Sequence, residues 1–88
     1  MPRLVITHKV VDVERWLKNK AERVEQLAPF GGHVTDHVAT DGSNNVSLTL
    51  DVPDLAPFQA AMAAPPPELS AAMERHGVIP PLTTYIEK

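Results

Sequence analysis

A single histidine stands among apolar residues close to the N-terminus. His8 lies two residues from Ile6 and two from Val10, and side chains alternate along a strand, so all three would share one face. A neutral imidazole can accept or release a proton near neutral pH, and burial would lower its pKa. His8 is therefore a candidate general acid or base. The alternative is a core histidine that is held by one backbone or side-chain partner.

Two further residues can supply a polar group to a bound molecule. His76 falls in the last turn of a predicted helix, where it also complements the helix dipole and needs no other role. Tyr85 carries a hydroxyl that can donate a hydrogen bond to an anionic intermediate. Four other large side chains are candidates to line a substrate pocket, although such residues more often belong to a core. They are Trp16, Phe58, Met62 and Met73.

The segment His33-Val-Thr-Asp36-His37 has the composition of a metal site but not the geometry. In a strand, His33 and His37 share a face but lie about 13 Å apart, and Asp36 points to the opposite face. One ion cannot be held by residues so placed, so we predict no metal site. The alternative role is edge-strand polarity, or polar contact across a dimer.

No cofactor-binding motif is recognisable in the sequence. The absence of cysteine removes thiol catalysis and Fe–S clusters. There is no P-loop, no dinucleotide fingerprint and no G-x-S-x-G elbow. We therefore expect no cofactor, and haem held by one histidine is an alternative that no motif supports.

Charge and hydropathy argue against two classes of partner. The 8 basic residues are scattered, glutamates are interleaved with them in the first predicted helix, and the net charge is −3. This mixture is typical of a solvated face, so nucleic acid is not an expected partner. No apolar run approaches the roughly 20 residues of a membrane helix, and no signal peptide is visible. The expected location is the cytoplasm.

The spacing of apolar residues predicts alternating strands and helices. Asp12 and Asp54 are suited to cap helix N-termini, and three consecutive prolines at 65–67 must interrupt the second helical region. Gly77 suits the position after the last helix. The predicted strands are 3–11, 33–40, 46–52 and 82–87, and the predicted helices are 13–28, 55–64 and 67–76.

This order is β-α-β-β-α-β, the split βαβ pattern of α+β ferredoxin-like folds. We expect one domain over residues 1–88, with an antiparallel sheet, both helical regions on one face, and the second helix broken by prolines. The other face would carry mixed side chains, and a chain this short has a small core. We therefore predict a homodimer that buries this face. Its residues are Val5, Thr7, Lys9, Val11, Ser47, Thr49, Asp51, Thr83 and Tyr85.

Taken together, several segments resemble small dimeric α+β barrel proteins, similar to antibiotic-biosynthesis monooxygenases and polyketide cyclases. The resemblance implies a homodimer whose sheets face each other, with a pocket in each subunit between sheet and helices. Monooxygenase members use an Asn-Trp-Tyr-type constellation, of which Trp16 matches one member by type and the Asn has no counterpart. The segments are 11–16, Asp54-Leu55, Pro67-Glu68-Leu69, Gly77-Val78-Ile79 and Thr84-Tyr85.

The resemblance and the candidate residues together predict a small-molecule pocket protein. It would be a cofactor-independent monooxygenase- or cyclase-like enzyme acting on an apolar aromatic or polyketide-type metabolite. His8 would be the general acid or base, and Tyr85 or His76 would polarise an enol or phenol oxygen. The alternative is a non-catalytic ligand-binding or assembly dimer with structural histidines. Met62 and Met73 flank the proline break and should border the same cavity.

Overall fold

The computed structural model describes residues 3–88, which contain one antiparallel sheet of four strands. The strand order is β2-β3-β1-β4, so β1 lies inside the sheet and pairs with a neighbour on each side. This confirms the predicted ferredoxin-like topology. The strands are β1 (Arg3–Val10), β2 (Gly32–Val38), β3 (Asn45–Asp51) and β4 (Val78–Ile86).

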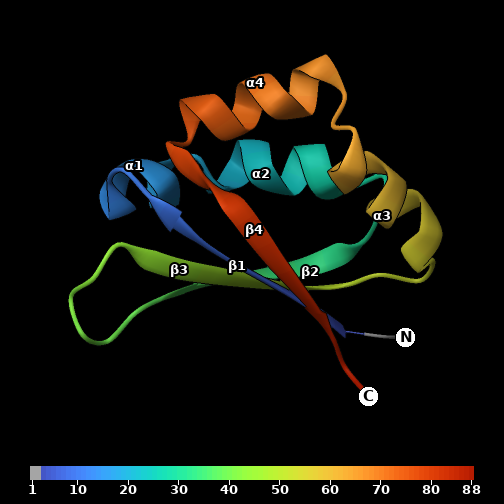
Figure 1. Ribbon diagram of the computed structural model, residues 1–88, viewed down its shortest axis with the longest axis horizontal. Coiled ribbons are helices and arrows are strands. Elements are labelled where there is room, and N and C mark those ends of the chain that lie inside the picture. The colour runs from blue at the N-terminus through green and yellow to red at the C-terminus, as the bar shows by residue number, and fades with distance from the viewer. Residues whose placement is uncertain (1–2) are drawn as a thin grey trace.

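All the helices of the described chain lie on one side of the sheet and leave its other side uncovered (Figure 1). The predicted caps are present, because a carboxylate oxygen of Asp12 accepts from the amide of Glu14 at 3.0 Å and Asp54 accepts from Ala56 at 3.2 Å. None of these helices is long and apolar enough to cross a membrane. They are α1 (Val13–Lys18), α2 (Lys20–Leu27), α3 (Leu55–Ala63) and α4 (Pro67–Arg75).

The single helix predicted over 13–28 is wrong in one respect, because the chain breaks it at Asn19 into α1 and α2. The side-chain amide of Asn19 donates to the carbonyl oxygen of Arg15 at 2.8 Å. Asparagine competes in this way with backbone hydrogen bonding, which weakens a continuous helix. The predicted break at the prolines is confirmed. Pro67 occupies the start of α4, where its fixed φ fits and its missing amide is not needed.

The last strand begins earlier than predicted, at Val78 rather than at residue 82. It runs through Pro80 and Pro81, which have no amide hydrogen to donate to a neighbouring strand. Two features make this possible. In the described sheet β4 is an edge strand, and its register with β1 shifts between Thr7 and Lys9, so the prolines fall where the ladder is interrupted.

The hydrophobic core fills the space between the sheet and the helices. Alternate residues of β1 and β3 point into it, and Trp16 from α1 and Phe58 from α3 are fully buried there. The opposite face carries hydroxyl-bearing and charged side chains together with Tyr85, which is 55% exposed. The sheet thus has one buried face and one open face, as the alternation predicted. The core residues on the sheet are Leu4, Ile6, Val10, Val46, Leu48, Leu50 and, just beyond β3, Val52.

Candidate functional site

A small cavity lies between the sheet and the helices. Its volume is about 50 Å³, and its wall comes from the three strands β1, β3 and β4 and from all four helices. Most of the wall is apolar, including Ile6, Leu48, Leu69 and Val78. The polar groups that border it belong to His8, Trp16, Arg23, Gln26 and His76.

His8 reaches this cavity from the middle of the sheet, where its side chain is almost fully buried (7% exposed). Its Nδ1 lies 3.0 Å from the carbonyl oxygen of Lys9. Because a carbonyl only accepts, Nδ1 carries the proton and Nε2 keeps a free lone pair. Burial lowers the pKa of His8 and the charge of Arg23 lowers it further, while the bond to Lys9 opposes both. His8 is therefore a neutral base at neutral pH.

His76 reaches the cavity from the C-terminal end of α4 and is 3% exposed. Its Nε2 lies 2.7 Å from a carboxylate oxygen of Glu22 on α2, so Nε2 carries the proton and donates. Arg75 also donates to that carboxylate, at 2.9 and 3.2 Å. Burial lowers the pKa of His76, whereas the Glu22 bond raises it. These two donors also lower the pKa of Glu22, which keeps it ionised.

Arg23 on α2 is buried beside Trp16, and its side chain is fixed by three contacts. Its Nη1 donates to the Trp16 carbonyl at 2.8 Å, and its Nη2 donates to Asp36 at 2.6 Å. Its Cζ lies 4.1 Å from the centroid of the Trp16 indole, within reach of a cation–π interaction. The His8 ring meets the same indole edge-on, with centroids 5.8 Å apart.

The sequence analysis assigned the basic residues of the first predicted helix, residues 13–28, to a solvated face. This prediction is wrong for Arg23, which is buried. Its glutamate neighbours in the sequence suggest exposure, yet it lies seven residues after Trp16 and four before Leu27, on the buried stripe of the helix. Its partner Asp36 points from β2 toward the helices, opposite to His37, as strand alternation predicted. The sequence signal that could have shown its burial is the placement of a charged residue at a helical position otherwise occupied by apolar side chains.

Three buried polar atoms at this cluster have no hydrogen-bond partner within residues 3–88. They are Nε1 of Trp16, Nε of Arg23 and Oδ1 of Asp36. A buried polar group without a partner costs about 1–3 kcal/mol. Two of them, on Trp16 and Arg23, belong to side chains that border the cavity.

Met62 and Met73 both border the cavity, as the position of the proline break predicted. They also border a second hollow of about 310 Å³ between the helical region and β4. Leu82 is shared by the two spaces as well. These three side chains therefore form the wall between the inner cavity and the outer hollow.

Phe58 and Tyr85 are not brought to the inner cavity. Phe58 is fully buried at another part of the core and borders a separate hollow with Leu4 and Leu55. Tyr85 pairs with Val5 of β1, and side chains paired across two strands share a face. Since Val5 and His8 point to opposite faces, the Tyr85 hydroxyl lies on the open side of the sheet.

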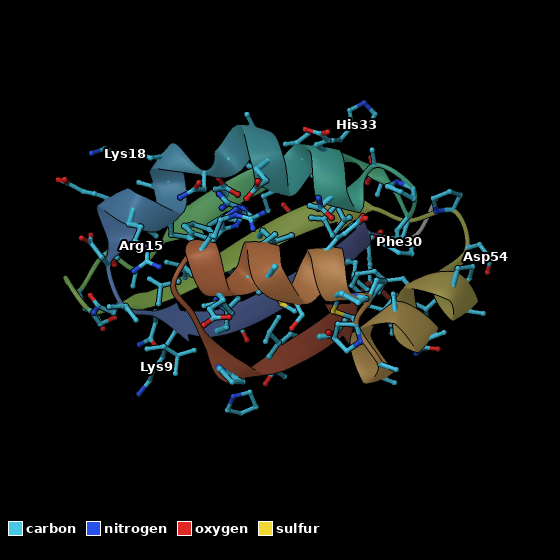
Figure 2. The ribbon with its side chains drawn as sticks, turned by 90° about the horizontal axis from the view of Figure 1, so that it is seen from above. Lys9, Arg15, Lys18, Phe30, His33 and Asp54 are labelled. Atoms are coloured by element: carbon cyan, nitrogen blue, oxygen red, sulfur yellow. The ribbon has the colours of Figure 1, made fainter. Side chains whose placement is uncertain are left out.

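The histidines of β2 stand apart from each other and from the cavity. His33 projects from the periphery with 86% of its side chain exposed, and its Nδ1 lies 2.9 Å from Asp51 (Figure 2). The Nε2 of His37 lies 3.3 Å from the Thr49 hydroxyl on the open face of the sheet. Within residues 3–88 no group of three histidine, aspartate or glutamate side chains is placed to hold a metal ion.

No protein-family model matches this chain, and no curated protein matches it in sequence. Solved structures do match over nearly its whole length. One is an antibiotic biosynthesis monooxygenase (TM-score 0.65, 14% identity, covering 100% of this chain and 97% of that one). Another is SnoaB from Streptomyces nogalater, a cofactor-independent oxygenase (TM-score 0.64, 17% identity, 99% and 90%).

A third match is a dimeric ferredoxin-like protein from an uncultured marine organism (TM-score 0.62, 7% identity, covering 98% of this chain and 92% of that one). At these identities the similarity concerns the fold. The chain has the fold of antibiotic biosynthesis monooxygenases and dimeric ferredoxin-like proteins.

Proposed function

We propose that this protein binds a small, mainly apolar aromatic or polyketide-type molecule between its sheet and helices. It acts on that molecule as a cofactor-independent monooxygenase- or cyclase-like enzyme. The observation that carries the proposal is that His8 and His76, both buried and both with a lowered pKa, border one apolar cavity. Perturbed titratable groups that converge on a pocket are typical of catalytic sites. The similarity in fold to a cofactor-independent oxygenase is consistent with this chemistry.

The inner cavity holds only one end of such a molecule. Ligand sites usually have volumes of roughly 300–1,000 Å³, whereas this cavity has about 50 Å³ and the outer hollow about 310 Å³. Methionine side chains rearrange readily because they are unbranched and flexible. Movement of Met62 and Met73 would join the two spaces. The reacting end would then lie beside the histidines and the apolar body would occupy the hollow.

In this arrangement His8 is the general base. Its Nε2 lone pair would take the proton of an enol or phenol, and the apolar wall would exclude water from the anion so formed. His76 is the second acid–base group, because the Glu22 carboxylate fixes its Nε2 proton and leaves Nδ1 free to accept. The role first expected of Tyr85 would require a molecule on the open face of the sheet.

We also propose that two copies associate through the open face of the sheet. Tyr85 and Ile79 are exposed there, and Val5 is half-buried. A broad hollow of about 540 Å³ crosses the same face and is lined partly by hydroxyl-bearing side chains. A second copy would cover the exposed apolar side chains, and the hydroxyl groups would supply hydrogen bonds across the interface.

The second candidate function is a non-catalytic ligand-binding or assembly dimer. One observation favours it, which is that each buried histidine already has a protein partner, Lys9 for His8 and Glu22 for His76. A histidine satisfied in this way can be purely structural. The two candidates differ in what happens when His8 is replaced.

The test compares His8→Gln and His8→Leu with wild type, and uses His33→Asn as the matched control on an exposed histidine. Asparagine suits position 33 because its φ is 56°. Binding of 1-naphthol, oxygen uptake with an anthrone and thermal unfolding are measured for each. The enzyme proposal expects both His8 variants to stay folded and to lose oxygen uptake. Unchanged uptake in a folded His8→Leu protein contradicts it.

A further inference from the structure

Two side chains that border the cavity carry a hydrogen-bond donor without an acceptor in the described chain. Trp16 Nε1 and Arg23 Nε have no partner within the described residues. Both residues are buried, with exposed fractions of 0% for Trp16 and 6% for Arg23. Donors this deeply buried are normally paired. Their occurrence together at one cavity, in groups that are stacked on each other, points to an acceptor that comes from outside the chain.

The Arg23 guanidinium is held through both of its terminal nitrogens, and Nε is its one nitrogen without a partner in the described chain. Nη2 is bound to Asp36 at 2.6 Å and Nη1 to the Trp16 carbonyl at 2.8 Å. The planar group also lies against the indole, with Cζ at 4.1 Å from the ring centroid. A donor fixed in advance needs no reorganisation when a charge develops next to it, which is the property that makes such groups effective in stabilising oxyanions.

We infer that Trp16 Nε1 and Arg23 Nε donate hydrogen bonds to one oxygen of the bound molecule and favour its anionic form. The inference rests on the proposed function and assigns to these two residues the oxygen-polarising role that Tyr85 is not placed to perform. The proton that leaves the ligand oxygen is taken by the Nε2 lone pair of His8, so no charge is created or lost overall. Trp16 and Arg23 then determine which oxygen-bearing ligands are retained.

The other charges around the cavity are compatible with an anionic oxygen. The charge of Asp36 is paired with Arg23. The charge of Glu22 is paired with Arg75, and its carboxylate also accepts from the Nε2 of His76. When His8 accepts the proton, its new positive charge faces the anion. The pair formed by the His8 imidazolium and the oxyanion is neutral as a whole, which limits the cost of burying it.

A resident water molecule is the competing explanation. The cavity is large enough for one, and a water with two or more polar partners is stable in such a place. A water would satisfy both donors in the free protein and would have no influence on the ionisation of a ligand. The two explanations therefore differ in the behaviour of a phenol whose ionisation can be observed directly.

The probe is 4-nitrophenol, whose ionised form absorbs visible light, and the matched ligand is 4-nitroanisole, in which the hydroxyl is methylated. The wild-type protein should bind the phenol at least about tenfold more tightly than the ether and lower the apparent pKa of the bound phenol by about one unit or more. Trp16→Phe removes the indole N–H and keeps an aromatic ring. This variant should lose about tenfold in affinity for the phenol and little for the ether.

A second measurement does not depend on the variant folding. The chain contains one tryptophan, so the indole N–H of Trp16 gives one signal in a nitrogen–hydrogen NMR spectrum. Titration with 4-nitrophenol should move this signal downfield, as expected for a new bond to an anionic oxygen, and 4-nitroanisole should not.

The outcomes separate the inference from the proposed function. Binding of both probes with equal affinity, an unchanged ionisation of the phenol and a stationary indole signal would overturn the inference and leave the pocket intact, with water as the partner of both donors. Failure of both probes to bind at millimolar concentration would count against the pocket itself, and so against the proposed function as well as the inference.

Discussion

The guanidinium of Arg23 lies 4.1 Å from the centroid of the Trp16 indole, which places a permanent positive charge inside the layer between helices and sheet. Asp36 balances that charge from β2, with side chains of the pair 7% and 5% exposed. Burial is the main cause that lowers the pKa of both buried histidines, and the same guanidinium lowers it further. One ion pair thus links α1, α2 and β2 and influences the electrostatics of the cavity.

Loss of either partner of this ion pair should strongly destabilise the protein. Asp36→Leu or Arg23→Met leaves the other charge buried and uncompensated, and we expect the free energy of unfolding to fall by about 3–5 kcal/mol. The double replacement Arg23→Met with Asp36→Leu should recover much of that loss, because no charge remains to be solvated. Urea unfolding of the four proteins measures this. Additive losses in the double variant would show that the two residues do not act as a pair.

The buried histidines should make stability depend on pH in a defined window. Burial lowers the pKa of His8 and of His76, so the unfolded chain binds protons more readily than the folded one. Stability contributed by the neutral imidazoles is complete above the unfolded value near 6.5 and is lost as pH falls below it toward the folded values. Thermal unfolding between pH 7 and pH 5 should show this decline.

The control for that decline is a comparison of single variants over the same pH range. His8→Gln should flatten the profile because it removes one of the two groups that take up protons on unfolding. His33→Asn should leave the slope unchanged, because it replaces an exposed side chain that does not border the cavity. An equal slope in all three proteins would contradict the assignment of the pH dependence to the buried imidazoles.

The alternation of side chains and the choice of capping residues were sufficient to predict most of the fold. Leu4, Ile6 and His8 share one face because β-strand geometry allows nothing else, and Asp12 and Asp54 cap helices by local hydrogen bonds. The interruption at Asn19 was not predicted. It depends on the hydrogen bond from the Asn19 side chain to the carbonyl oxygen of Arg15, four residues earlier. Such a bond competes with helical hydrogen bonding, but an asparagine in the sequence does not by itself show that the bond forms.

The site was predicted in part, and its unpredicted part involves contacts between distant segments. His8, Trp16 and the two methionines were placed at a cavity by their helical or strand period. The partnership of Arg23 with Asp36 joins residues on different elements, and no local period encodes it. Tyr85 was assigned both to the open face and to the catalytic set, and the pairing with Val5 places it on the open face.

Two adjacent glycines at the start of β2 should differ sharply in their tolerance of alanine. A Cβ on Gly31 would lie 2.1 Å from the carbonyl oxygen of Asp51, and backbone cannot move aside cheaply, whereas a Cβ on Gly32 would meet nothing within 4 Å. We expect Gly31→Ala to destabilise by about 1–3 kcal/mol or more. Gly32→Ala is the matched control and should cost much less. Equal stabilities in urea unfolding would refute the close approach at Gly31.

Association through the open face of the sheet should depend on Tyr85. Sedimentation of the wild-type protein at micromolar concentration should give about twice the monomer mass. Tyr85→Glu places a charge in the proposed interface and should yield monomers. Val24→Glu changes a comparably exposed apolar residue on the outer side of α2 and should remain dimeric, since that residue lies away from the sheet. A wild-type protein that is monomeric at every concentration would exclude the dimer.

The hydrogen bond between Glu22 and His76 gives a final prediction, which concerns the pKa of His76. The carboxylate of Glu22 accepts the Nε2 proton of His76 at 2.7 Å and raises the pKa of that imidazole, against the larger opposing effect of burial. Glu22→Gln keeps an oxygen acceptor but removes the negative charge, so the pKa of His76 should fall further. NMR titration of the His76 imidazole signals in both proteins measures the shift.

If His76 takes part in proton transfer, the change in its pKa should appear in the enzyme as well. The acidic limb of the pH profile of oxygen uptake with an anthrone should move to lower pH in Glu22→Gln, by the same amount as the His76 titration moves, because the limb reports protonation of an essential base. The same variant also frees Arg75, so Arg75→Gln serves as the control that disturbs the ion pair but leaves the Glu22 carboxylate on His76. A limb that stays in place while the His76 titration shifts would show that this histidine is structural and leave His8 as the acid–base group of the cavity.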